Sequence, residues 1–272
     1  MSEIRKWLKD WGQSLLDLVY AKSGACRLCQ RSWVVGEFSS GRGDLCDDCR
    51  AALTACPEGL IPCPGCGRFF LPHDYGGDRC AECRSNPLPI SAGVVVGPYT
   101  GMLRQAIHWY KFGRRKELAD PLAMLLREQV KPIVEAGSGE DLLVIPVPLH
   151  RDRLKERGFN QSELLARAMI KRMESEPGDR PRLLLRTDIL TRPVETPSQT
   201  GLKRSERMVN LVGAFQAEEG RGRELSGRRV LLVDDIITTG STSGECARVL
   251  LEAGSGPVSL GVLAGGIIGK RS

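Results

Sequence analysis

The sequence predicts an α/β protein in which a parallel sheet flanked by helices follows a small cysteine-rich module. Eight of the ten cysteines form four CxxC pairs before residue 84. After residue 89, short apolar runs alternate with amphipathic stretches, and one of the apolar runs ends in two adjacent aspartates. Alternating strands and helices are typical of parallel sheets covered by helices. We therefore divide the chain into an N-terminal helix (1–22), a double zinc ribbon (23–88) and an α/β domain (89–272).

Length and composition fit one ordinary core with an accessory module. Of 272 residues, 41% are hydrophobic and 26% charged, as in globular proteins. No apolar run approaches the roughly 20 residues that a membrane-spanning helix needs. Charged residues interrupt the N-terminal stretch, which argues against a signal peptide, and its apolar residues recur every three or four positions, which predicts an amphipathic helix. We expect a cytoplasmic protein without membrane insertion.

The four CxxC pairs predict two structural zinc ions. Sixteen residues (30–45) separate the first two pairs and thirteen (67–79) the last two, a spacing typical of zinc ribbons. A disulfide framework would need an oxidising compartment. Four-cysteine sites have no open coordination position, so the ions should stabilise the fold. Sequential sharing of ligands is simplest, and an interleaved arrangement stays open. The ligands would be Cys26, Cys29, Cys46, Cys49, Cys63, Cys66, Cys80 and Cys83.

The α/β pattern begins at residue 92. Residues 92–96 and 142–149 read as strands, and residues 100–109 and 118–134 read as helices. In open parallel sheets, ligands bind at the carboxyl ends of the strands. Pro148 would lie at such an end.

Two segments between the strands are chemically suggestive. Arg157, next to a glycine and near a strand end, suits pyrophosphate oxygens; the alternative is a surface arginine followed by a helix cap at Asn160. Residues 174–200 are polar and interrupted by prolines, which predicts a mobile loop. A basic segment after that loop could close over a charged ligand and exclude water.

Residues 230–242 carry the strongest functional signal. The apolar run 230–233 is typical of a strand buried on both faces, and Asp234 and Asp235 follow it. Two carboxylates suit the vicinal hydroxyls of a ribose. A hydroxyl-rich turn then leads into a predicted helix, whose free N–H groups and dipole favour a phosphate. That turn consists of Thr238, Thr239, Gly240, Ser241 and Thr242.

This segment resembles the phosphoribosyl-pyrophosphate (PRPP) motif of type I phosphoribosyltransferases: an apolar strand, two acids, two variable residues and TTGST. The resemblance implies a type I phosphoribosyltransferase-like sheet that binds PRPP with Mg²⁺. The two acids would hold the ribose hydroxyls, and residues 238–242 would surround the 5′-phosphate. A phosphoacceptor receiver domain also carries two aspartates after an apolar strand. There the pair lies on the first strand, and too little chain follows Asp235 for that fold.

A longer series of motifs resembles the ComF family of competence proteins. These are the CxxC pairs, YKFG, PVPLH, RGFNQSELLARA, TPSQTGL, RxxNLxxAF and VLLVDDIITTGST. The family joins a zinc ribbon to a phosphoribosyltransferase-like domain and is linked to DNA uptake during natural transformation. Outside the PRPP segment, the resemblance carries over Arg157, Gly158, Phe159, Asn160, Gln161, Gln199, Arg207 and Asn210. The chain departs from the family at residues 265–272, which puts the last strand in doubt.

Two classes of function fit these motifs. The first is phosphoribosyl transfer, with Asp234, Asp235, Arg157 and Arg207 as catalytic residues and no recognisable acceptor-selecting segment. The second is a factor without transferase activity that binds single-stranded DNA or docks on a DNA-uptake helicase. All of the net positive charge lies in residues 91–272, with 28 Lys+Arg against 22 Asp+Glu. Basic clusters there fit either a diphosphate or a longer polyanion. They lie at 114–116, 151–157, 203–207 and 221–229.

Overall fold

The chain divides into two compact units, residues 1–52 and 53–272. The computed structural model describes residues 23–34, 45–71, 77–113, 115–137, 139–175, 181–193, 213–218 and 220–269. The predicted N-terminal helix lies outside these ranges. The first unit contains an antiparallel strand pair, and α2 begins just after Cys46 and runs across the boundary between the units. Their bounds are β1 (Ser23–Ala25), β2 (Ser32–Val34) and α2 (Asp47–Thr54).

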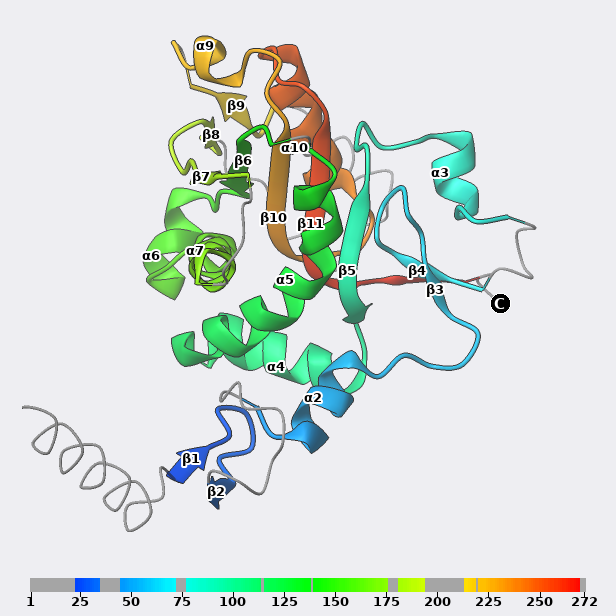
Figure 1. Ribbon diagram of the computed structural model, residues 1–272. Helices are drawn as coiled ribbons and strands as arrows, with labels where there is room; N and C mark the ends of the chain where they lie inside the picture. Colours follow the sequence, from blue (N-terminus) through cyan, green and yellow to red (C-terminus); the bar gives the residue numbers. More distant parts are fainter. Residues whose placement is uncertain are drawn as a thin grey trace, which may run out of the picture. The chain divides into compact units, whose positions relative to one another are not determined.

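Five parallel strands form the main sheet of the second unit (Figure 1). Their spatial order is β5-β11-β10-β6-β7, which places β10 at the centre. Each neighbouring pair is parallel, which explains why the central strands are continuous apolar runs. The predicted parallel sheet is thus confirmed. The strands are β5 (Gly93–Pro98), β6 (Leu142–Pro146), β7 (Leu183–Leu185), β10 (Val230–Ile237) and β11 (Val258–Gly265).

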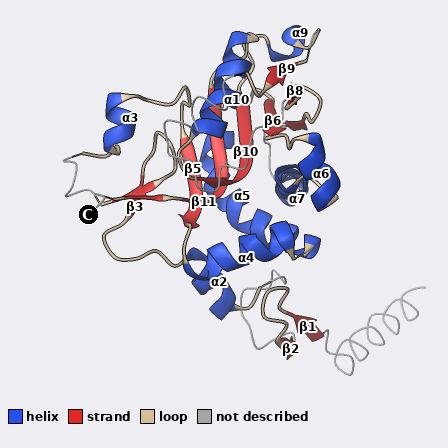
Figure 2. Cartoon of the chain, turned by 180° about the vertical axis from the view of Figure 1, so that it is seen from behind, coloured by secondary structure: helices blue, strands red, loops and turns tan. Residues whose placement is uncertain are grey.

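Helices cover both faces of this sheet (Figure 2). Alternate residues of β10 and β11, such as Val230 and Leu260, share an apolar core with α10. Gly261 points to the opposite face, where an added Cβ would lie 3.0 Å from Val130 of α5. Helix α7 packs against α5, β6 and β10. The helices are α4 (Gly101–Phe112), α5 (Ala119–Glu135), α6 (Arg151–Arg157), α7 (Gln161–Glu174), α9 (Gly222–Leu225) and α10 (Ser241–Glu252), with a 3-10 turn, η2 (Lys116–Leu118).

A smaller sheet joins the end of the chain to the second cysteine group. Its strand order is β12-β4-β3, with β12 parallel to β4. The last strand of the main sheet, in doubt from the sequence, is therefore present: β11 runs to Gly265 and the chain continues into β12. Phe69 and Phe70 of β4 belong to the same core as α10. The elements are β3 (Ile61–Pro62), β4 (Phe69–Phe70), α3 (Ala81–Ser85) and β12 (Ile267–Ile268).

The prediction of a loop over residues 174–200 is wrong for its middle part. That part contains the edge strand β7 and also β8 (Leu190–Thr191), which pairs with β9 (Gln216–Ala217). Strand β7 has three residues, of which only Leu183 is buried. Such a short run, flanked by arginines, gives no readable periodicity. Residues 176–180 and 194–212 lie outside the described ranges.

We expect Gly265→Ala to lower the free energy of unfolding by about 1–3 kcal/mol, the usual cost of overpacking. A Cβ at Gly265 would clash with the Gly67 carbonyl oxygen and lie 3.2 Å from the Arg68 Cα, so the main chain would have to shift. Gly269→Ala is the matched control, because nothing lies within 4 Å of its Cβ position. Urea denaturation of both variants measures the difference, and equal stabilities would contradict the close approach.

Candidate functional site

Two buried acids lie at the carboxyl end of the central strand. The first four residues of β10 pair with both β6 and β11, and β6 ends opposite Val233. Strand β10 continues to Ile237. Asp234 and Asp235 therefore lie in the part of β10 that extends beyond the end of β6. Their exposed fractions are 7% and 3%. Buried carboxylates are costly unless paired or hydrogen-bonded, so their partners define the site.

Asp234 is held by hydrogen bonds to one of its oxygens. Its Oδ1 accepts from the Ser162 hydroxyl at 2.9 Å and from the Asp235 N–H at 2.9 Å. Burial, together with the negative charge of Asp235, raises the pKa of Asp234 to about 7, against the opposing charge of Lys111. This carboxyl therefore holds its proton to a higher pH than an ordinary aspartate does.

Asp235 is held by an ion pair instead. The Lys111 Nζ, in the last turn of α4, lies 2.7 Å from the Asp235 Oδ2. The two side chains are 17% and 4% exposed. The acids are thus chemically different: Asp235 has a cationic partner, whereas Asp234 has hydroxyl and amide partners.

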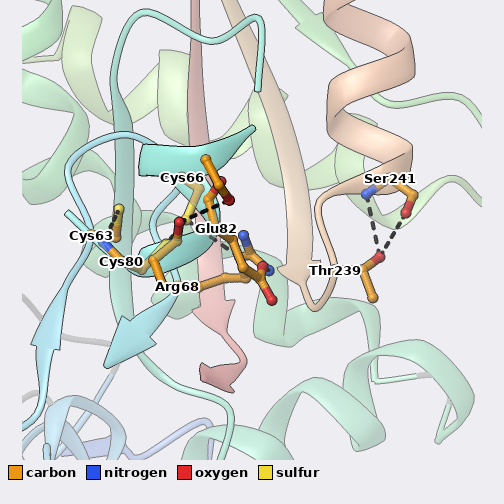
Figure 3. A network of polar contacts seen from close by, with 9 residues as sticks. Cys63, Cys66, Arg68, Cys80, Glu82, Thr239 and Ser241 are labelled. Atoms are coloured by element: carbon orange, nitrogen blue, oxygen red, sulfur yellow. Dashed lines mark hydrogen bonds and ion pairs between the residues drawn. The ribbon is translucent and has the colours of Figure 1, made fainter. Parts of the chain in front are cut away.

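The hydroxyl-rich turn lies between β10 and α10, as predicted. Gly240 has a φ of +83° and stands just before the first residue of α10. The Thr239 Oγ1 lies 2.9 Å from the Ser241 Oγ and accepts from the Ser241 N–H at 3.3 Å (Figure 3). Thr238 is exposed, while Thr239, Ser241 and Thr242 are half-buried. The turn therefore presents hydroxyls and a helix N-terminus together, the combination that binds anions.

Arg157 is half-buried and held in place rather than free on the surface. It donates to the Gln161 Oε1, and its Cζ lies 5.1 Å from the centroid of the Phe112 ring. Burial lowers the pKa of Arg157, while the charge of Asp235 acts in the opposite direction. Arginine side chains are not deprotonated in proteins, so Arg157 is a cation. It supplies fixed positive charge near the acid pair.

A helix cap at Asn160, which belonged to the alternative interpretation of this segment, is present. The Asn160 side chain accepts from the Ser162 N–H at 3.0 Å and donates to the Val147 carbonyl at 3.1 Å. It therefore ties the start of α7 to the end of β6, next to the half-buried Pro148. This contact places Ser162 beside Asp234.

Three of the predicted site residues, Gln199, Arg207 and Asn210, lie outside the described residues, as do two of the basic clusters in part or whole. The cluster at 221–229 is largely engaged in local contacts. Arg221 pairs with Asp188 and Glu224, and Arg228 lies 3.5 Å from Asp141. This cluster offers less positive charge to a polyanion than the sequence suggested.

Lys111 and Ser162 belong to the site but were not singled out from the sequence. Tyr110, a candidate for base stacking from the sequence, is instead fully buried beside them. Tyr110 donates from its hydroxyl to the Gln161 carbonyl at 2.7 Å, which joins α4 to α7. Lys111 and Tyr110 lie within YKFG, and Ser162 follows RGFNQ directly. The motifs were therefore visible, but the partner of each side chain was not.

The eight predicted cysteine ligands form two groups, with sequential sharing of the CxxC pairs. Within each group the sulfur atoms all lie within 4.8 Å of one another. The Cys29–Cys46 and Cys66–Cys80 sulfurs are 3.8 and 3.9 Å apart. A tetrahedral zinc site with Zn–S bonds of about 2.3 Å has sulfurs about 3.8 Å apart, so the residues fit one zinc ion each.

The second group has a buried arginine beside it. The Arg68 Nε donates to the Cys66 Sγ at 3.3 Å, and the same side chain pairs with Glu82 (Figure 3). Arg68 is 3% exposed. A cation there offsets the negative charge that four thiolates bring to a zinc ion.

Known proteins resemble the chain over almost its whole length. It is 33% identical over 239 residues to the DNA utilization protein YhgH of Escherichia coli O157:H7, covering 87% of this chain and 95% of that protein. It is 30% identical over 223 residues to Competence protein F of Haemophilus influenzae, covering 80% and 89%. Competence protein ComFC of Bacillus subtilis is 24% identical over 216 residues, covering 77% and 79%.

The chain belongs to the ComF family. The fold class predicted for it is confirmed by the parallel sheet, its flanking helices and the two four-cysteine groups. No family model matches the ComF chain. Among solved structures, a hypoxanthine phosphoribosyltransferase from Staphylococcus aureus aligns at 15% identity and a TM-score of 0.35, covering 57% of this chain and 76% of that one. This score is too low to carry an argument. Among the described residues of the ComF chain, no helix is long and apolar enough to cross a membrane.

Proposed function

We propose that this ComF-family chain binds PRPP at the carboxyl end of β10 and acts in the use or uptake of DNA. The observation that carries the proposal is the pair of buried acids near the end of β10, followed two residues later by a hydroxyl-lined turn and the N-terminus of α10. A ribose phosphate offers matching groups: vicinal hydroxyls for carboxylates and a dianion for the turn. The names of the relatives, which refer to competence and DNA utilization, support the biological context.

Each part of PRPP has a matching group. Asp234 and Asp235 accept hydrogen bonds from the ribose hydroxyls, and residues 238–242 surround the 5′-phosphate. Arg157, which is held by Gln161 and the Phe112 ring, neutralises the diphosphate, with Arg207 as a second cation. Mg²⁺ is the usual companion of substrate phosphates and would add positive charge to the diphosphate.

The reaction that fits such a site is phosphoribosyl transfer. The bond from the ribose C1 to the diphosphate oxygen breaks, the diphosphate leaves with the electron pair, and an acceptor nucleophile bonds to C1. Positive charge develops on the sugar during this step. The protein therefore needs to position the ligand, stabilise the leaving diphosphate and exclude water, all of which it can do without a covalent intermediate.

Calorimetry with Mg²⁺ and PRPP tests the proposed site. Wild type is expected to bind, and Asp234→Asn/Asp235→Asn is expected to bind at least about 100-fold more weakly, because two charge-assisted contacts are lost. Asp188→Asn, an exposed aspartate on another part of the unit, is the control and should bind like wild type. Equal binding by all three proteins would refute the assignment of the acids.

Single-stranded DNA is a second candidate ligand, because cations stack on aromatic rings around α4. The Arg104 and Arg115 Cζ atoms lie 5.9 and 5.6 Å from the Tyr99 and Trp109 ring centroids, and Phe112 is 57% exposed. Aromatic faces combined with positive charge suit single strands. Titration of the same variants with oligothymidine separates the candidates, since a DNA surface would keep its affinity in the double aspartate variant.

A further inference from the structure

Lys111 is the cation that neutralises Asp235, although the two residues come from different elements. Its Nζ lies 2.7 Å from the Asp235 Oδ2 in a largely buried environment. Leaving a buried carboxylate without its cationic partner is strongly destabilising. A ligand that uses Asp235 as a hydrogen-bond acceptor must therefore displace Lys111 or share the carboxylate with it.

The two cations beside Asp235 differ in how they are held. Arg157 is fixed between the Gln161 side chain and the Phe112 ring. Lys111 has no ion pair within the described residues other than that with Asp235. Its flexible four-carbon stem lets the ammonium move, while Tyr110, the preceding residue, anchors the end of α4 to α7. Lys111 is thus the cation free to change partner.

We propose that Lys111 contacts the diphosphate of the bound ligand, exchanging Asp235 for a phosphate oxygen when Asp235 turns to the ribose hydroxyls. This inference rests on the proposed PRPP site. Lys111 reaches Asp235 from α4, and Arg157, at the end of α6, stacks on Phe112, the residue that follows Lys111, so the two cations lie on adjoining elements. The hydroxyl turn at the start of α10 takes the 5′-phosphate separately. Lys111 therefore distinguishes a ligand that carries a diphosphate from one that carries only the 5′-phosphate.

Two ligands and three variants test this role by calorimetry. Lys111→Gln keeps a hydrogen-bond donor for Asp235 but removes the charge; Lys111→Arg keeps the charge. Lys131→Gln is the matched control, because Lys131 is a half-exposed lysine 3.9 Å from Glu135 on α5. We expect Lys111→Gln to weaken binding of Mg²⁺-PRPP by roughly 10- to 100-fold, the effect of one charge-assisted contact. Ribose 5-phosphate should bind within about twofold of wild type, and Lys111→Arg should recover part of the PRPP affinity.

The outcomes are separable. Unchanged PRPP affinity in Lys111→Gln, or an equal loss for both ligands, would overturn the diphosphate contact, since an equal loss means that Lys111 only holds Asp235. Failure of wild type to bind either ligand would overturn the PRPP site itself and this role with it. If Lys111→Gln does not fold, lysine-selective ¹⁵N NMR of wild type decides the question. The Lys111 ammonium signal, assigned from Lys111→Arg, should shift with Mg²⁺-PRPP but not with ribose 5-phosphate, and no difference between the ligands would overturn the role.

Discussion

Replacing one cysteine of the second metal group is expected to unfold the α/β unit, whereas the same change in the first group leaves that unit folded. Cys80→Ser removes a ligand from the second group and Cys49→Ser from the first. Binding of structural zinc contributes roughly 10–16 kcal/mol in small zinc modules, comparable to the whole stability of a domain, about 5–15 kcal/mol. A weakened second site therefore leaves too little free energy to keep the unit folded.

The reason for this asymmetry is that the second group is part of the sheet's core. Its four cysteines are at most 4% exposed and share an apolar core with Val95 and Ile237. Main-chain hydrogen bonds also join the segments around these cysteines to the main sheet. The Gly93 N–H donates to the Pro64 carbonyl at 2.8 Å, and the Phe69 N–H donates to the Gly266 carbonyl at 2.9 Å. Loss of the metal would release both ends of this contact at once.

Circular dichroism and zinc analysis of the two variants measure the effect. Cys49→Ser should keep one zinc ion and the cooperative melting transition of the sheet. Cys80→Ser should lose that transition at the same zinc content. A wild-type transition in Cys80→Ser would show that the core, without its metal, is sufficient. If the second metal is needed, adding a chelator to Cys49→Ser should reproduce the unfolded state.

Cysteine spacing predicted the metal ligands but not what the second group packs against. The CxxC pairs are local patterns, and each needs only its own turn to be recognised. The close approach of Gly93 and Gly265 to the Cys66–Gly67 turn depends on two strands far away in the sequence. From the sequence, both cysteine groups were assigned to one module, residues 23–88, and that domain division stays a prediction. In the structure, the second group lies in the compact unit 53–272.

The candidate site likewise has one part that the sequence pattern predicts and another that only the tertiary structure reveals. Asp234, Asp235 and the hydroxyl turn lie within one short segment, residues 234–242, so the pattern of strand, acids and turn identified them together. Lys111 and Ser162 reach those acids only because α4 and α7 pack at the end of the sheet. Neither residue type indicates its partner, since a lysine at the end of a helix is usually solvated. Tertiary contacts decide which of the two acids is paired with a cation.

Asp234→Asn is expected to stabilise the protein at pH 8 and to reduce its loss of stability with rising pH. The pKa of Asp234 is about 7 in the folded state, against an ordinary value of 3.8. Between these values the folded protein keeps a proton that the unfolded chain has released. The contribution of Asp234 to the free energy of unfolding is therefore fully present below about pH 4. It is lost as the pH rises through 7. A shift of this size corresponds to at most about 4 kcal/mol.

The asparagine can keep the geometry, because its side-chain oxygen can still accept from the Ser162 hydroxyl and the Asp235 N–H. Urea denaturation between pH 5 and 8 measures the difference from wild type. Asp188→Asn is a control for which the expected change in stability has the opposite sign. Hydrogen bonding to Arg186 lowers the pKa of Asp188, so this variant should lose stability at pH 8. A wild type without any slope over this range would contradict the raised pKa of Asp234.

A stabilising Asp234→Asn variant that no longer binds PRPP would connect energetics to function. A buried carboxyl that must ionise near neutral pH lowers the stability of the ligand-free fold, and an amide of the same shape relieves that cost. Retaining the acid is then explained by an interaction that only a carboxylate makes, such as accepting from a ribose hydroxyl. If instead the variant gains stability and binds PRPP like wild type, ligand binding at this position needs no negative charge. The role of Asp234 would then pass to Asp235 and its partner Lys111.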